Sequence, residues 1–326
     1  MARYAGVSTA VVSYVINGGP KPVAPHTAAR VRNAIDLLNY RPNVNAQALR
    51  RGTTEMLGLV LSDPTNPFFT EFAAAIGTAA FVRGHALMIA AARGSEDVEM
   101  QLVDDLVRRQ VDGLIVASVF ARPDLVIKNY NRNTPTVWID APGVIPGYAC
   151  VRSDSYQGAL LGVRHLIEVH GHRRIGLVVG GPGSINADPR QRGWQDALTA
   201  AGLEQGPFAR VEWSREGGYA GGQTLMDLGD PPTAIFASSD LQAVGVLRAA
   251  HERGIRVPED LAVVAFDGTK ESEFCWPPLT VVAQPIDEMA EAAVRLVLDE
   301  SRPDLYETFV GELVIRRSCG CAASDG

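Results

Sequence analysis

Polar side chains stand directly after several apolar runs of this chain. Carboxylates and hydroxyls in such places can hydrogen-bond the hydroxyl groups of a small polar ligand. Any single one could instead cap a helix, because Asp and Ser favour that position. As a set they are expected to converge on one binding site, and the members are Ser62, Asp63, Arg93, Asp140, Ser239, Asp240 and Asp267.

The cysteines raise the question of a metal site. Cys319 and Cys321 form a C-x-C pair, and the other two cysteines are Cys150 and Cys275. In the sequence, no second pair and no histidine cluster stands near the C-x-C pair to complete a tetrahedral site. We therefore expect free thiols in a reducing cytoplasm, with no metal and no cofactor.

Charge divides the chain unevenly. Residues 1–52 carry seven basic residues and one acidic residue, a formal charge of +6, whereas the whole chain carries −7. The remainder therefore carries −13. This asymmetry favours a basic nucleic-acid-binding head on an acidic body, the alternative being a solvated basic face.

Length and composition indicate a soluble protein with two or three folded units. The chain has 326 residues, of which 46 % are hydrophobic and 21 % are charged. No apolar stretch approaches the roughly 18 residues of a membrane-spanning helix. The first residues, MARYAGVSTAVV, do not resemble a secretion signal. These features predict a cytoplasmic protein with no membrane association.

The elements of the head are predicted to be short helices. Ser8 can cap a helix whose apolar positions are Val12, Val15 and Ile16, and residues 17–19 (NGG) end it. A third helix carries an apolar face up to the stop at Tyr40-Arg41-Pro42, formed by Val31, Ala34, Ile35 and Leu38.

From Met56 onward, apolar runs of strand length alternate with helical stretches. This alternation is typical of parallel sheets covered on both faces, a doubly wound α/β architecture. We expect two similar lobes with a cleft between them, because about 260 residues are more than one sheet normally needs. The chain near Asp154 resembles a crossing point between the two lobes. The runs span residues 57–62, 86–92, 113–118, 136–140, 174–180, 234–239 and 261–267.

The whole chain, in order, resembles the LacI/GalR family of transcriptional regulators. YAGVSTAVVSYVING is similar to the family's helix-turn-helix, and LNYRPNVNAQALRRG to the end of its third helix and its hinge helix. Further segments are similar to successive parts of the family's sensor domain: LVLSDPTNPFF, RRQVDGLIVAS, DSYQGALLGVRHLIEVHGHRRIGLVVGG, RQRGW, ASSDLQAVGVLRAA, GIRVPEDLAVVAFDG and PPLTVVAQP.

The resemblance implies an all-α helix-turn-helix head and a periplasmic-binding-protein-like sensor of two parallel doubly wound sheets. We expect the head at residues 1–43, a hinge at 44–54 and the sensor at 55–326. Lobe one would comprise residues 55–153 and 285–312, and lobe two residues 154–284 and 313–326. Relatives begin their first helix some residues earlier, so the first helix is expected to be truncated here by a start placed too late.

A recognition helix enters the major groove by its N-terminal part, so the side chains opposite its apolar face are expected to meet bases. These are Thr9, Ala10, Ser13 and Tyr14. Ser8 and Asn17 suit phosphate contacts. Arginine is common in the family where this chain has Tyr14, and tyrosine cannot clasp a guanine with two hydrogen bonds. We expect an operator that depends less on guanine at that position.

The resemblance assigns the hinge to the minor groove. Ala46 would lie against the groove floor, and Leu49 would wedge between central base pairs and kink the duplex. Arg50 and Arg51 are placed to meet phosphates. A helix this short is marginal alone, so it should order only with DNA and a second subunit.

For the sensor, the resemblance assigns Arg190 to a clamp on paired hydroxyls or a carboxylate. Asp140 and Asp267 match acceptors for sugar hydroxyls. Tyr219 falls where the family often has an aromatic ring against the ligand, while Phe68 and Trp276 are candidates to close the pocket or to lie in the core. Ser239 replaces a common asparagine just before Asp240, so a relative's ligand cannot simply be copied.

We therefore predict a ligand-responsive transcriptional regulator, a repressor by resemblance. It would bind pseudo-palindromic double-stranded operator DNA as a homodimer and sense a sugar or similar polar metabolite. The alternative is a small-molecule sensor or sugar-binding protein of the same fold without effective DNA binding. An enzyme is disfavoured because the G-x-S-x-G, G-x-x-x-x-G-K-[ST] and G-x-G-x-x-G motifs are absent.

Overall fold

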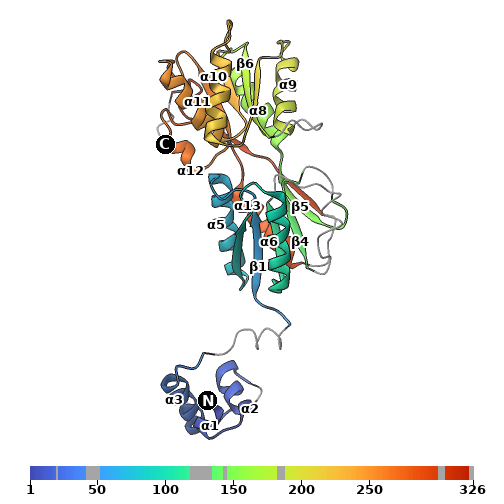
Figure 1. The fold of residues 1–326 in the computed structure, drawn as a ribbon, viewed down its shortest axis with the longest axis vertical. Coiled ribbons are helices and arrows are strands. Elements are labelled where there is room, and N and C mark those ends of the chain that lie inside the picture. Colours follow the sequence, from blue (N-terminus) through green and yellow to red (C-terminus); the bar gives the residue numbers. More distant parts are fainter. Residues whose placement is uncertain are drawn as a thin grey trace. The chain divides into compact units, whose positions relative to one another are not determined.

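The protein forms two compact units, residues 1–54 and residues 55–326 (Figure 1). The computed structural model describes residues 1–19, 21–41, 52–117, 134–141, 145–181, 188–299 and 305–322. Within these ranges, no helix has the length and apolar character needed to cross a membrane.

The N-terminal unit has three short helices in its described part, α1 (Ala2–Ala5), α2 (Thr9–Asn17) and α3 (Pro25–Leu37). As predicted, α2 begins after Ser8, whose hydroxyl accepts a hydrogen bond from the Val11 amide at 3.3 Å. The helix ends at Gly18, which has a left-handed φ of 65°. The three helices share a small core of Ala5, Val12, Val31 and Ala34.

Arg30 fastens α3 to the end of α1. Its guanidinium donates to the carbonyl oxygens of Ala5 at 2.5 Å and Gly6 at 3.5 Å, groups that a helix end leaves without a partner inside the helix. At the other end of α3, Ala24 occupies the N-cap position and provides no side-chain hydrogen bond. The first turn of α3 therefore lacks the side-chain acceptor that Ser8 provides for α2.

The first lobe of the second unit contains a six-stranded sheet in the order β11-β5-β4-β3-β1-β2, and all of its neighbouring strands are parallel. The strands are β1 (Met56–Leu61), β2 (Ala86–Ala91), β3 (Gly113–Ala117), β4 (Thr136–Ile139), β5 (Ala149–Ser153) and β11 (Tyr306–Phe309). Its helices are α5 (Pro67–Val82), α6 (Glu96–Arg108) and α13 (Ile286–Leu298).

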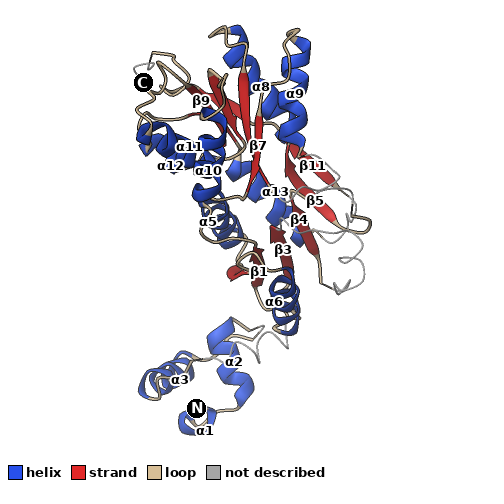
Figure 2. Cartoon of the chain, turned by 45° about the horizontal axis from the view of Figure 1, so that its top comes forward, coloured by secondary structure: helices blue, strands red, loops and turns tan. Residues whose placement is uncertain are grey.

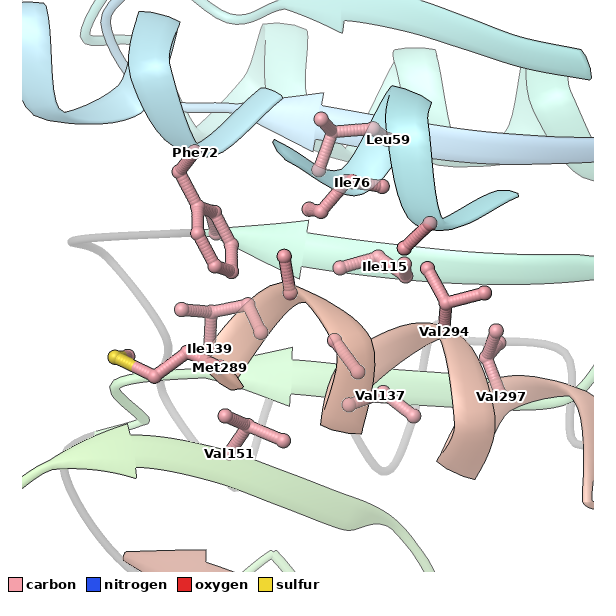
Figure 3. Packing of buried hydrophobic residues seen from close by; sticks show 14 of the residues in the cluster. Leu59, Phe72, Ile76, Ile115, Val137, Ile139, Val151, Met289, Val294 and Val297 are labelled. Atoms are coloured by element: carbon pink, nitrogen blue, oxygen red, sulfur yellow. The ribbon is translucent and has the colours of Figure 1, made fainter. Parts of the chain in front are cut away.

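Two apolar cores fill the two faces of this sheet. On one face, side chains of α5 and α13 pack against alternate residues of β1, β3 and β4 (Figure 3). On the other face, residues of α6 pack against the intervening strand positions. Both faces are covered, which explains why these strands read as continuous apolar runs rather than as alternating ones.

The second lobe repeats this plan in a sheet of order β12-β10-β9-β8-β6-β7. Its strands are β6 (Ile175–Gly180), β7 (Phe208–Val211), β8 (Ala234–Ala237), β9 (Ala262–Asp267), β10 (Thr280–Ala283) and β12 (Glu312–Val314), of which β12 is antiparallel. Its helices are α8 (Ser155–Glu168), α9 (Pro189–Ala200), α10 (Arg215–Met226), α11 (Asp240–Glu252) and α12 (Lys270–Phe274). Helices flank both faces (Figure 2): α8 and α9 cover one, α10 and α11 the other.

The chain passes between the two sheets three times. The passages lie between β5 and α8, between β10 and α13, and between β11 and β12. The fold class predicted from the sequence, a helical head and two parallel-dominated sheets in a two-lobed sensor, is therefore confirmed. Because parallel strands end at one edge of their sheet, each lobe gathers its post-strand residues at a single edge.

Candidate functional site

Asp267 ends strand β9 at the edge where polar side chains gather. Its carboxylate Oδ1 accepts a hydrogen bond from Gln284 Nε2 at 2.7 Å, and its backbone has a left-handed φ of 121°. Gly268 follows against Ala283, where a Cβ would not fit. Burial raises the pKa of Asp267 to about 7, and the positive charge of Arg190 opposes this rise.

Asp240, the first residue of α11, lies next to Asp267. Its Oδ2 accepts hydrogen bonds from the Thr269 amide at 2.6 Å and the Thr269 hydroxyl at 2.8 Å. Its Oδ1 is buried and has no hydrogen-bond partner. Burial, followed by repulsion from Asp267, raises the pKa of Asp240 well above its usual value. The two carboxyls therefore resist being ionised together.

Arg190, in the first turn of α9, is held by Asp188 through a two-pronged contact. Arg190 Nε and one terminal nitrogen donate to the two Asp188 oxygens, each at 2.9 Å. The other terminal nitrogen donates to the Ser238 carbonyl at 2.8 Å. These bonds use three of the five N–H groups of a guanidinium, so two remain for a ligand.

Two aromatic rings enclose the Arg190 guanidinium. Its carbon lies 4.5 Å from the ring centroid of Trp213 and 5.3 Å from that of Phe266, within cation–π distance. Trp213 also covers Gly180, where a Cβ would collide with the indole. Sequence reasoning missed Trp213, although it stands two residues after β7, in the same post-strand position as the residues it did select.

Tyr219 does not provide this ring. It lies on α10, where its hydroxyl donates to Glu252 Oε2 at 2.5 Å and accepts from Gln223 Nε2 at 2.8 Å. These bonds direct it along the α10–α11 surface, while Trp213 lies against the guanidinium. Trp276 follows α12 and is 86 % exposed, so it does not cover the charged group in this structure.

Asp140 is a residue of the first lobe that interacts electrostatically with Arg190. It follows β4 with a left-handed φ of 51°, and its Oδ1 accepts a hydrogen bond from the Ser153 amide at 2.8 Å. Asp140 as a residue is exposed, yet surrounding protein desolvates its carboxyl and raises the pKa to about 6. The charges of Arg190 and Asp188 also act on this pKa, the first lowering it and the second raising it. Residues of both lobes therefore share one electrostatic environment.

Four other predicted site residues take no part in the hydrogen bonds described above, although one of them, Ser239, stands directly before Asp240. Ser62 is buried and donates to the Ala117 carbonyl at 3.1 Å. Phe68 is buried and stacks on Phe72, with 5.9 Å between ring centroids. Ser239 is buried and caps α11 by accepting from the Gln242 amide at 3.2 Å. Arg93 is exposed and has a left-handed φ of 51°.

In the head, the predicted DNA-facing residues lie on and beside α2. Thr9 and Ala10 are exposed. Asn17 Nδ2 donates to the Ser13 hydroxyl at 3.2 Å. The Tyr14 ring lies against Gly19, leaving no room for a Cβ there. Ser8 is the exposed N-cap described above. The hinge residues Ala46, Leu49, Arg50 and Arg51 lie outside the described residues.

The C-x-C pair does have histidine neighbours in space. The sequence places none nearby, but the fold brings His165 and His170 of the second lobe against Cys319 and Cys321. The two cysteines are free thiols, as predicted, but the premise that no histidines accompany them holds only along the sequence. The cause is the long return of the chain, which carries β12 and the C-terminal segment back to α8 some 150 positions after the histidines.

Known proteins match this chain over both units. Residues 1–43 match the domain described as bacterial regulatory proteins, lacI family, and residues 163–319 match a periplasmic binding protein-like domain. The HTH-type transcriptional repressor PurR of Mannheimia succiniciproducens is 32 % identical over 331 residues, covering 98 % of this chain and 97 % of that protein. The chain belongs to the LacI family. It is a DNA-binding transcriptional regulator with a ligand-sensing domain.

Other LacI-family proteins agree in sequence and fold. The regulator GalR of Escherichia coli is 33 % identical, covering 98 % of this chain and 94 % of that protein. The lac repressor dimer bound to operator and the anti-inducer ONPF superposes with a TM-score of 0.86 at 28 % identity, covering 98 % of this chain and 97 % of that one. The CelR–cellobiose complex gives 0.73 at 30 % identity, covering 97 % and 98 %.

Proposed function

We propose that this chain is a homodimeric repressor that senses a neutral polyhydroxylated ligand, a sugar, at the Arg190 group. The observation that carries the proposal is the guanidinium held between Trp213 and Phe266 beside the carboxyls of Asp140 and Asp267. The accessible part of the Trp213 ring suits the apolar face of a sugar ring, and carboxylates accept hydrogen bonds from its hydroxyls. The cellobiose and ribose in solved LacI-family structures support this ligand class.

The unpaired polar atoms at these strand ends favour a ligand that donates protons. Asp240 Oδ1 and Gln284 Oε1 are buried acceptors without a partner, and Ser153 Oγ is a buried hydroxyl without one. Buried polar groups in native structures are normally hydrogen-bonded, so such atoms point to a missing partner. Sugar hydroxyls can donate to Gln284 Oε1 and accept from Ser153 Oγ, and they can either donate to Asp240 or accept from it when its carboxyl is protonated.

Charge argues against an anionic ligand. Asp188 already pairs with Arg190, so Arg190 offers no unbalanced positive charge to an anion, and any of the carboxyls of Asp140, Asp240 and Asp267 that is ionised would repel one. A carboxylate or phosphate would meet this repulsion and would leave the buried acceptors unpaired. Of the two partners first considered for Arg190, paired hydroxyls and a carboxylate, the hydroxyls are favoured.

For DNA we propose that α2 lies in the major groove. Thr9, Ala10, Ser13 and Tyr14 would face bases, and Ser8 and Asn17 would contact phosphates. The Ser13–Asn17 hydrogen bond would open to free both side chains for DNA. Ala46, Leu49 and Arg50 of the hinge would enter the minor groove, as the sequence analysis expects. The lac repressor dimer on its operator supports a dimer on a two-fold site, and a regulator of bacterial operator DNA would act in the cytoplasm.

A ligand screen on the full-length chain tests the sensor. We expect a neutral mono- or disaccharide to raise the Tm, with uronates and sugar phosphates giving no shift. Nucleosides form a further arm of the screen. Trp213→Ala should reduce the shift, while the matched variant Tyr219→Phe should keep it, because Tyr219 faces Glu252 instead of the site. A shift caused only by anionic ligands, or one that is unchanged in Trp213→Ala, would refute the assignment.

A gel shift with promoter fragments of the chain's own operon tests the repressor half. We expect binding at low salt that weakens steeply as salt increases, because phosphate contacts release counterions. The ligand found in the screen should change the affinity. Sugar binding without any DNA binding would instead support a sensor that does not act on DNA.

A further inference from the structure

Four metal-binding side chains meet on the second lobe, away from the Arg190 group. His165 lies on α8, His170 lies in the turn after it, and Cys319 and Cys321 lie beyond β12. One ligand atom from each lies within 4.8 Å of all the others. Cys319 is buried, while His170 and Cys321 are partly accessible. Neither the effector site nor DNA binding gives these residues a role.

The separations between the ligand atoms fit a tetrahedral ion. Zn–N bonds of about 2.05 Å and Zn–S bonds of about 2.3 Å give tetrahedral edges of about 3.3 Å between nitrogens and about 3.6 Å between nitrogen and sulfur. The two Nε2 atoms of His165 and His170 lie 3.3 Å apart. His165 Nε2 lies 3.3 Å from Cys319 Sγ and 3.7 Å from Cys321 Sγ, and His170 Nε2 lies 3.3 Å from Cys321 Sγ.

We propose that His165, His170, Cys319 and Cys321 form a Cys₂His₂ site for Zn²⁺. Two imidazole nitrogens and two thiolates are a common ligand set of structural zinc, and four protein ligands leave no position for substrate. Metal binding replaces the thiol protons, so Zn²⁺ would bind with proton release to solvent. The ion would link α8 to the C-terminal segment across about 150 positions of the chain.

The residues around the cluster orient its sulfur atoms as ligands for an ion. The Thr280 hydroxyl accepts from the Arg316 amide at 2.9 Å and donates to Cys319 Sγ at 3.1 Å, so its proton is directed at the sulfur. Such a bond stabilises a thiolate ligand and fixes its direction. Gly320, between the two cysteines, has a left-handed φ of 103° and lies against the His170 ring. This turn brings both sulfurs to the same side of the segment.

Metal analysis of the full-length protein, purified without a histidine tag, tests the site. We expect zinc equal in amount to the chain and retained through dialysis. In protein stripped of metal and loaded with Co²⁺, we expect the intense visible bands of tetrahedral cobalt and a thiolate charge-transfer band. Absence of zinc, together with a weak octahedral cobalt spectrum, would overturn the proposal, as would a Cys319–Cys321 disulfide in protein purified under reducing conditions.

Matched variants assign the ligands. Cys321→Ser and His170→Asn should lose the zinc and the tetrahedral cobalt spectrum. Cys275→Ser and His172→Asn should keep both, because Cys275 lies elsewhere and His172 instead pairs with the Thr233 hydroxyl at 2.9 Å. Circular dichroism and retained sugar or DNA binding identify variants that have folded. If folded Cys321→Ser protein keeps its zinc, the ion lies elsewhere and the assignment fails.

Discussion

Replacing Asp267 by asparagine should change how the stability of the sensor depends on pH. Burial raises the pKa of Asp267 from 3.8 to about 7. Between these values the folded chain holds a proton that the unfolded chain has lost. The stability that this proton gives is present at low pH and is lost as the pH rises through the folded-state pKa. An asparagine side chain does not titrate, so the variant should lack this loss.

The magnitude follows from the two pKa values. Each tenfold change in proton affinity is worth about 1.36 kcal/mol, so the full difference is at most on the order of 4 kcal/mol. From about pH 5 to about pH 8, the free energy of unfolding of the wild type should fall relative to Asp267→Asn by about 3 kcal/mol. The asparagine keeps an oxygen for Gln284 Nε2, which limits other losses.

Urea unfolding at these two pH values, followed by tryptophan fluorescence, measures the difference. Asp230→Asn serves as the control, because Asp230 is an exposed carboxylate of the same lobe that pairs with Arg174 on the surface. Comparing each variant with wild type at the same pH removes the contribution of the titrating groups that do not interact with Asp267. Asp240 does interact with it, and the pKa of Asp240 should fall in Asp267→Asn because the repulsion is removed. If the gap between wild type and Asp267→Asn is the same at both pH values, the carboxyl is not protonated by burial and the reasoning is wrong.

Three further predictions concern the ligand, the operator and the head. Trp213→Ala should weaken sugar binding at least about tenfold, equal to about 1.4 kcal/mol, and calorimetry would reveal an unchanged affinity if the ring plays no part. Tyr14→Arg should create a preference for guanine worth about 1–3 kcal/mol, which selection from random operators would detect; an unaltered consensus would contradict the placement of α2. Ala24→Ser should stabilise the head by about 1 kcal/mol, because its hydroxyl can cap α3. Hydrogen exchange of α3 measures this change, and no slowing would show that the cap does not form.

The long apolar runs predicted the architecture well, because burial on both faces leaves a clear signal in a single sequence. The runs at 57–62 and 174–180 became β1 and β6, and residues ending other runs, such as Asp140 and Asp267, came together as expected for the edges of parallel sheets. Short or partly polar strands such as β7 leave little pattern, so Trp213, two residues after β7, was missed.

The remaining differences arise from contacts that the sequence does not encode locally. The hydrogen bond from Tyr219 to Glu252 joins two helices, and no pattern in the sequence near Tyr219 predicts it. Asp188 neutralises Arg190 from two positions away, yet a spacing of two residues is not a recognised ion-pair pattern. The pairing of Cys321 with His170 depends on a chain return of 151 positions, which only the tertiary fold supplies.

The three passages between the lobes also determine the order in which the protein can fold. Met289, Ala293 and Val294 of α13 fill the core of the first lobe, against β-strands made more than 130 residues earlier in synthesis (Figure 3). Until α13 leaves the ribosome, one face of that sheet is covered only by α5, while most of the second lobe is already complete. The first lobe is synthesised first but completes its core only after most of the second lobe has been made. Until then its exposed sheet needs protection from aggregation. Proteolysis of ribosome-bound chains in which residue 285 has just emerged from the exit tunnel should cleave β1–β5 while sparing α8–α11; equal resistance of both lobes would contradict this order.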